Sequence, residues 1–362
     1  LLMVLSMIIN ESLVARTFGT YVMQAVDKTT DPVWVPVLAV SLIAVVFAVN
    51  IATNALISRV AVVSALLKVG GILAFALVTL WFADFSFSSS GAAGAVGAEA
   101  GGATGFIAAV ALGILAYKGF TTITNSGSEL KNPETNIGRA IIISLVICLI
   151  VYLLVSWAVS STLSIEEIAK ARDYALAEAS RPARGQYCVW FTIAVAIVAT
   201  SSGLLASVFA VSRMLTMLTK MELVPHRHLG MTGHLQTHML VYTCVAAALL
   251  AAFFDLSRIA ALGAIFYLLM DIGIHWGLLR HLKREVDAKL SILITAMVLD
   301  ALLLGVFLWV KVRQEPMILA WAAGGVAAIF LVEWQFLRVH RFSDGEDPNY
   351  RSPDGSDGRG NN

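Results

Sequence analysis

Ten apolar stretches, each long enough to cross a membrane as a helix, constrain this chain most. About 20 helical residues cross the roughly 30 Å of bilayer hydrocarbon. The composition agrees, with 58% apolar residues, 14% charged residues and a mean hydropathy of +0.81, far from the average soluble domain. We therefore predict an all-α, polytopic membrane protein. The predicted spans are Leu2–Val26, Val33–Thr53, Leu56–Phe82, Thr104–Leu130, Ile137–Ser161, Tyr187–Leu218, Gln236–Phe254, Ser257–His281, Leu290–Val312 and Pro316–Leu337.

The distribution of lysine and arginine predicts the orientation in the membrane. The side that carries Lys131 and Arg139 holds the larger share of these residues, and cytoplasmic loops carry such an excess. That side is expected to be cytoplasmic, in a cell (inner) membrane, with the C-terminus inside. We expect a transmembrane domain over residues 1–342. The remainder, 343–362, is polar and rich in Gly, Asp and Asn, which predicts a disordered cytoplasmic tail.

Several functional classes receive no support from the sequence. A net charge of +1 gives no argument for nucleic-acid binding. Cys148, Cys188 and Cys244 fall inside predicted helices without framework spacing, which favours packing over disulfides or metal ligation. No carboxylate or cysteine completes a ligand set around the four histidines of one cytoplasmic loop. We predict neither a metal nor a cofactor. Those histidines are His226, His228, His234 and His238.

One external loop has its own helical signal. Ser164 can act as an N-cap, and Glu167 three residues later completes a capping box. Apolar residues then recur at helical spacing. We predict a short amphipathic helix on the external side, within Ser164–Ser180.

A lysine and a glycine interrupt the fourth apolar stretch, in the run Ala116-Tyr117-Lys118-Gly119-Phe120. An ionisable residue at bilayer depth costs about 2.5–3.5 kcal/mol on insertion scales, so Lys118 needs an internal partner or a water-filled cavity. Irregular backbone at that depth is tolerated where protein buries it or a cavity is lined by it. Helices broken in this way form the binding element of secondary transporters.

Two interpretations of Lys118 remain open at this stage. The lysine either lines a cavity, where it contacts an anionic substrate group or takes part in proton coupling, or it pairs structurally with Glu11, the acid of the first stretch. Its central position makes snorkelling to the interface difficult.

A second lysine, Lys68, lies in the middle of the third stretch among Val, Leu and Gly. Burial shifts the charge equilibrium of such a lysine, so it is a plausible proton carrier. The alternative is a structural bridge to Ser201, Ser202 or a backbone carbonyl. Thr200, Ser201 and Ser202 place three hydroxyls in the sixth stretch, although such hydroxyls also hydrogen-bond between helices in any membrane bundle.

The remaining intramembrane acids offer weaker hypotheses. Asp271 and His275 have i,i+4 spacing on one predicted helix, so they are candidates for a proton relay or for a helix-end cap. Asp300 and Glu333 have no partner visible in the sequence. An intramembrane protease would need two facing aspartates in a suitable context, a Ser–His pair or a zinc motif, and the chain shows none of these. We predict that it is not an enzyme.

Three segments of the sequence resemble the amino acid–polyamine–organocation (APC) superfamily of permeases. The segment from Ala116 through Glu129-Leu130-Lys131-Asn132-Pro133 to Ala140 is similar to that family's sixth helix and following loop. Ala206–Met214, continuing through Glu222-Leu223-Val224-Pro225, resembles the end of its eighth helix. Asn50–Lys68 resembles its fourth-to-fifth helix junction.

The resemblance implies a sodium-symporter-like fold of two inverted five-helix repeats, with substrate held by unwound first and sixth helices. The matching substrate-binding stretch is Ala116, Tyr117, Lys118, Gly119, Phe120 and Thr121. Many relatives carry a carboxylate there, where this chain has Lys118 and Thr121. In some proton-coupled members a fifth-helix lysine stands where sodium would bind, against hydroxyls of the eighth helix. Lys68, Ser201 and Ser202 match those coupling positions.

The resemblance also sets a register. The family's sixth helix corresponds to the fourth stretch, so the chain is expected to run from the family's third helix to its twelfth, as an N-terminally truncated permease domain. We thus expect a secondary active transporter of amino acids or related amines, proton-coupled or exchange-type, working by alternating access. Its partners would be a small-molecule substrate, protons and the lipid bilayer. The alternatives are a non-transporting membrane sensor or subunit with the same fold and, less favoured, an intramembrane enzyme. Substrate, direction and oligomeric state stay open.

Overall fold

The computed structural model describes residues 1–26, 33–52, 54–86, 102–119, 123–124, 131–221, 235–282 and 289–344, and in these ranges the regular elements are helical. Nine of the described helices are long and apolar enough to cross a membrane. This confirms the predicted fold class. The nine are α1 (Leu2–Ala25), α2 (Trp34–Ala52), α3 (Asn54–Phe82), α7 (Pro133–Thr162), α10 (Gln186–Lys220), α11 (Leu235–Phe253), α12 (Leu256–Gly277), α13 (Leu290–Gln314) and α14 (Pro316–Asp344).

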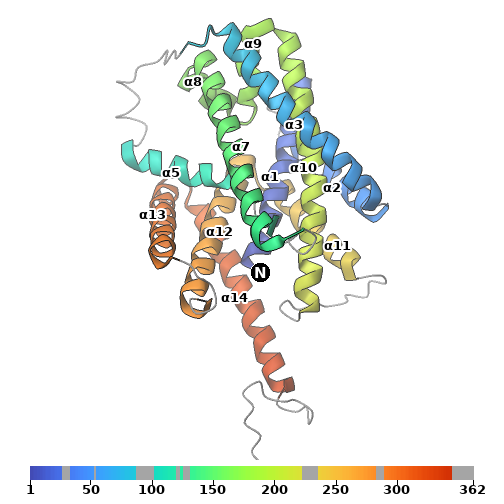
Figure 1. Cartoon of the computed structure of the whole chain (residues 1–362), viewed down its shortest axis with the longest axis vertical. Helices are drawn as coiled ribbons and strands as arrows, with labels where there is room; N and C mark the ends of the chain where they lie inside the picture. The colour runs from blue at the N-terminus through green and yellow to red at the C-terminus, as the bar shows by residue number, and fades with distance from the viewer. Residues whose placement is uncertain are drawn as a thin grey trace, which may run out of the picture.

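The predicted helix Thr104–Leu130 is wrong as a single span. Helix α5 (Gly102–Leu115) ends after 14 residues, and residues 116–119 form a turn. Figure 1 shows α5 running crosswise to the long axis of the molecule, above α13. A continuous apolar composition did not produce a continuous helix here, since the chain leaves the α-helix at Ala116, two residues before Lys118.

Helix α1 lies at the centre of the bundle (Figure 1) and packs against α2, α10, α11 and α12. It separates two apolar core clusters. One cluster joins α1 to α2, α10 and α11 through residues such as Ile43, Leu204 and Val208. The other joins it to α5, α12, α13 and α14 through Ile259 and Phe307. A polar residue on α1 is therefore enclosed by protein on several sides.

The segment between α7 and α10 confirms the predicted short helix. It contains α8 (Ile165–Ala171), a 3₁₀ turn η2 (Arg172–Tyr174) and α9 (Ala175–Arg184). The Glu167 amide donates to Ser164 Oγ at 3.3 Å, and the Ser164 amide donates to Glu167 Oε2 at 2.8 Å, which completes the capping box. The amide and the hydroxyl of Ser164 both donate to Glu167 Oε2, and these two bonds hold the pKa of the Glu167 carboxyl below its usual value.

Two predictions about the chain's organisation are not tested by these helices. The inverted-repeat arrangement and the register from third to twelfth helix stay predictions. Ser343 and Asp344, the first two residues of the predicted tail, belong to α14, and the rest of the tail lies outside the described residues.

Candidate functional site

The break after α5 is an ordered turn. The amides of Ala116, Tyr117 and Lys118 each donate to the carbonyl three residues earlier, at 3.0, 3.0 and 3.2 Å. Such i to i+3 bonds tighten the end of an α-helix and use carbonyls that the helix would leave unpaired. The unwound stretch expected at Ala116–Thr121 is thus present over residues 116–119. Phe120 and Thr121 lie outside the described residues.

Neighbouring helices hold the break in place. Tyr152 of α7 donates its hydroxyl to the Ala116 carbonyl at 2.7 Å, and its ring packs edge-on against Tyr117 at 5.2 Å between centroids. A side chain from a neighbouring helix thereby satisfies a backbone group that the broken helix released. On the other side α12 approaches closely at Gly263, where a Cβ atom would lie 3.2 Å from Leu115 Cδ2.

The Lys118 amine turns inward from the break towards α1 and α12. It donates to both the backbone carbonyl and the hydroxyl of Ser6 on α1. Its nitrogen also lies 5.6 Å from the ring centroid of Tyr267 on α12, a cation–π arrangement. The direct partner of Lys118 is therefore Ser6. Glu11, the structural partner considered from the sequence, interacts with the lysine electrostatically.

A cavity of about 230 Å³ opens beside Lys118. It is smaller than the roughly 300–1,000 Å³ of drug-sized ligand sites, so it suits a small solute. Three segments that are distant in sequence meet around it, namely α1, the break and α10. The lining residues are Met7, Asn10, Lys118, Gly119, Gly203, Ala206 and Ser207.

Glu11 lies directly behind this cavity. The residue is 0% exposed, and Ser207, which lines the cavity, donates its hydroxyl to Glu11 Oε1 at 3.3 Å. The second carboxyl oxygen, Oε2, has no hydrogen-bond partner among the described residues. An unpaired carboxylate is costly in a site from which water is excluded. The hydrogen bond from Ser207 and, to a lesser extent, the charge of Lys118 offset this cost.

The predicted coupling residues come together only in part. Lys68 on α3 points its amine towards α10, and its nitrogen lies 3.9 Å from where a Cβ on Gly203 would be. Ser201 and Ser202 instead donate their hydroxyls within α10, to the carbonyls of Ile197 at 2.7 Å and Val198 at 2.6 Å. The role of these three residues in coupling stays a prediction.

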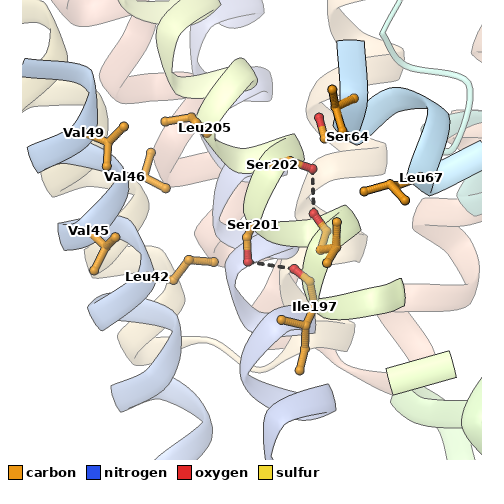
Figure 2. Close-up of a pocket in the computed structure, with 12 residues that line it drawn as sticks. Leu42, Val45, Val46, Val49, Ser64, Leu67, Ile197, Ser201, Ser202 and Leu205 are labelled. Atoms are coloured by element: carbon orange, nitrogen blue, oxygen red, sulfur yellow. Dashed lines mark hydrogen bonds between the residues drawn. The ribbon is translucent and has the colours of Figure 1, made fainter. Parts of the chain in front are cut away.

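Ser201 and Ser202 line a second, larger cavity of about 650 Å³ between α2, α3 and α10. Figure 2 shows their hydroxyls bonded back to the α10 backbone, facing aliphatic side chains. None of the described residues that line this cavity is charged. Its lining residues are Leu42, Val45, Val46, Val49, Val63, Ser64, Leu67, Ile197, Val198, Ser201, Ser202 and Leu205.

The intramembrane acids pair differently from the sequence hypothesis. His275 Nδ1 lies 3.2 Å from Asp300 Oδ2 of α13, so Asp300 has a partner that its own helix did not reveal. Asp271, expected to pair with His275, interacts with it electrostatically. Packing of α13 against α12 explains the difference. Of the clustered histidines, His238 is buried on α11, and the other three lie outside the described residues.

Sequence reasoning missed the residues that complete the site from neighbouring helices: Ser6, Asn10, Ser207, Tyr152 and Tyr267. One signal was available on α10, where small residues recur at i, i+3 and i+4 as Gly203, Ala206 and Ser207. Small residues with this spacing mark a face where a helix admits a close neighbour.

A bundle of apolar helices in which a broken segment and a central helix enclose a small polar cavity has the architecture of a membrane transporter. The comparison with protein families agrees, because the amino acid permease family matches residues 1–337. The chain belongs to this family, within the APC superfamily.

Individual relatives are similar at a lower level. The inner membrane transport protein YbaT of Escherichia coli (strain K12) is 23% identical over 92% of this chain and 76% of its own length. An uncharacterized protein, MJ0609, of Methanocaldococcus jannaschii is 29% identical over 57% of the chain and 46% of that protein. The cationic amino acid transporter 3, mitochondrial, of Arabidopsis thaliana is 26% identical over 44% of the chain and 26% of that protein.

Proposed function

We propose that this membrane transporter is a secondary active carrier of amino acids or related amines in the cytoplasmic membrane, with its C-terminus inside. The observation that carries the proposal is the cavity in which Lys118 and Gly119 of the break meet α1 and α10. Family membership supports amino acids as the substrate class, and two of the relatives are named cationic amino acid transporters.

The cavity has a group for each part of an amino acid. Lys118 supplies a cation for the α-carboxylate, and charge-assisted hydrogen bonds of this kind are the strong ones. Gly119 lets a ligand approach the backbone, since nothing lies within 4 Å of the position a Cβ would take. Asn10 and Ser207 add polar groups from two facing helices. Phe120 and Thr121 continue the proposed binding stretch.

Proton coupling through Lys68 forms the second part of the proposal. The lysine amine lies against Gly203, and Gly203 lines the substrate cavity. A change in the charge of Lys68 therefore acts on a helix that contacts the substrate. Ser201 and Ser202 retain acceptor lone pairs for this amine, because their hydroxyl hydrogens are used within α10.

Uptake into proteoliposomes by the intact protein tests the proposal. A panel of labelled amino acids is supplied to wild type and to Lys118→Met, which removes the cation at similar length. Losing a hydrogen bond to a charged group costs about 1.5–3 kcal/mol, so we expect the KM of Lys118→Met to rise roughly 10- to 150-fold.

The matched control is Lys170→Met, on the exposed external helix α8, which should transport as wild type does. Equal KM values for wild type and Lys118→Met would remove Lys118 from the substrate site. Absence of uptake for the whole panel by wild type would overturn the proposed substrate class.

A further inference from the structure

We propose that Glu11 binds one proton when substrate binds, because Glu11 and the substrate carboxylate compete for the single positive charge of Lys118. This inference rests on the proposed function, since it requires an anionic substrate group at Lys118. The inference adds a second ionisable group, Glu11 on α1, to the proposed transport site. Proton binding is linked to substrate binding because the charges in the site must balance.

The surroundings of Glu11 decide how its charge can be balanced. The side chain is 0% exposed, so water does not stabilise the carboxylate. Its one hydrogen bond comes from Ser207, and its Oε2 has no partner in the described part of the chain. A buried carboxyl in this position is neutralised either by a neighbouring cation or by a proton.

The groups that face Glu11 come from the helices that pack on α1, namely α2, α10, α11 and α12. α10 supplies the Ser207 hydroxyl, and α11 supplies the Cys244 thiol, which interacts electrostatically with Glu11. α12 supplies Tyr267, which contacts Lys118. No ionisable residue occurs in the sequence of α2. Among the described residues, Lys118 is thus the cation that acts on Glu11, and its effect adds to that of the Ser207 hydrogen bond.

The cation on α1 itself, Arg16, is engaged elsewhere. Arg16 lies five positions after Glu11 and interacts electrostatically with Asp173 and Asp255, acids that lie outside the cavity. Lys68 approaches α10 from α3, with its nitrogen 3.9 Å from where a Cβ on Gly203 would be. One cation therefore serves two carboxylates once an amino acid enters.

The charge balance gives the coupling. Without substrate, Lys118 offsets Glu11 and the pair is neutral. When the substrate carboxylate takes the lysine's charge, Glu11 loses its counter-ion and takes up a proton from solution, so the site returns to neutrality. By linkage, a proton on Glu11 strengthens substrate binding by the factor with which substrate strengthens proton binding.

Calorimetric titration of the intact protein with a transported amino acid tests this inference. Titrations in buffers of different ionisation enthalpy report the number of protons taken up on binding. We expect wild type to take up about one proton per substrate bound, and its affinity to rise by up to about tenfold for each unit that the pH falls. The substrate α-carboxylate stays ionised between about pH 5 and about pH 8, so its own titration does not contribute.

Glu11→Gln should take up no proton on binding and lose the pH dependence of affinity. The amide keeps the size of the side chain and an oxygen for Ser207, and size-exclusion chromatography checks that the variant is folded. Glu11→Asp retains a carboxyl group and should retain proton uptake. Asp300→Asn, at the α12–α13 contact with His275, is the matched control and should behave as wild type.

The outcomes separate the two proposals. If wild type binds no amino acid, the proposed function fails. If wild type binds an amino acid without proton uptake, or if Glu11→Gln takes up protons as wild type does, the proposed function stands and the assignment to Glu11 is overturned.

Discussion

The two faces of α10 differ in chemistry although they are one residue apart in sequence. Ser202 lines the larger, apolar cavity of about 650 Å³, and Gly203 lines the smaller cavity of about 230 Å³ beside Lys118. Hydroxyls occur on both faces. Those of Ser201 and Ser202 bond to their own helix, whereas that of Ser207 crosses to Glu11 on α1.

This difference indicates that the larger of two cavities is not necessarily the better candidate for the transport site. Hydroxyls that donate to their own helix have no hydrogen left to donate to a ligand, so the described lining of the larger cavity offers a ligand few polar contacts. On the smaller side a broken helix, a cation and a half-paired buried carboxyl converge. Those features are costly in a membrane and persist where function requires them.

Filling each cavity in turn gives the largest expected effect. Gly203→Leu places a branched side chain between Lys68 and the smaller cavity, while Ser202→Leu adds the same side chain to the apolar one. Overpacking costs about 1–3 kcal/mol, so we expect Gly203→Leu to weaken amino-acid binding roughly 5- to 150-fold. Ser202→Leu should bind the amino acid with an affinity within about twofold of wild type, because a small change in binding free energy gives a small change in affinity.

Calorimetric titration measures both affinities, and uptake into proteoliposomes measures the consequence for transport. Thermal unfolding shows whether either variant has lost stability as well as binding. If Ser202→Leu is instead the variant that loses binding, the substrate occupies the larger cavity, and its assignment to the smaller cavity is wrong.

Removing the charge of Lys68 separates two proposed roles of a proton, namely driving accumulation and accompanying substrate binding. Lys68→Met should abolish accumulation driven by a pH gradient, since the proposed carrier is gone, so the ratio of internal to external substrate falls to about one, which is equilibrium without a driving force. Equilibrium binding should keep its proton uptake, because Glu11 and Lys118 are intact.

Counterflow in the absence of a gradient, recorded beside accumulation, tells loss of coupling from loss of transport. Lys220→Met, at the C-terminal end of the same α10, is the control. Gradient-driven accumulation by Lys68→Met at the wild-type level would exclude Lys68 as the proton carrier.

Much of the fold could be predicted because the hydropathy of a segment indicates directly whether lipid or water surrounds it. The lipid selects apolar helices of sufficient length, so nine spans were placed to within a few residues. Helix α8 could be predicted from the capping box at Ser164, because a capping box depends on residues that are close together in the sequence. The exception was the stretch after Leu115, where composition alone does not reveal that α5 stops.

The site could be predicted only where a single residue was anomalous for a membrane. Lys118 and Lys68 stood out as charges among apolar neighbours. Ser6 and Tyr267 did not, because serine and tyrosine are unremarkable in a helix until packing brings them to the lysine. His275 was assigned to Asp271 because helical spacing is visible in a sequence, while the contact with Asp300 depends on how α13 packs.

The smallest expected effect concerns the ion pair between Arg181 and Glu178 on α9. It tests whether the pH dependence of substrate binding is confined to the cavity beside Lys118. Arg181 donates to Glu178 Oε2 and Oε1 at 2.8 and 2.9 Å, and Gln24 of α1 donates to the same carboxylate at 3.1 Å. The hydrogen bond from Arg181, followed by its charge, lowers the pKa of the Glu178 carboxyl. Because Gln24 belongs to the helix that carries Glu11, a change at this pair has a direct route towards the transport site.

A carboxyl whose pKa is lower in the folded state stabilises the fold above its unfolded pKa, and the stabilisation is lost as the pH falls through the folded value. We therefore expect Glu178→Gln to lose about 0.2–1 kcal/mol at neutral pH, as is typical of exposed ion pairs. The difference from wild type should vanish below about pH 4, where the wild-type carboxyl is also protonated. Thermal unfolding across this range measures the effect, and titration of substrate should show proton uptake equal to that of wild type. A changed proton uptake in Glu178→Gln would mean that the C-terminal end of α1 shares the linkage. The pH dependence of substrate binding could then no longer be attributed to Glu11 alone.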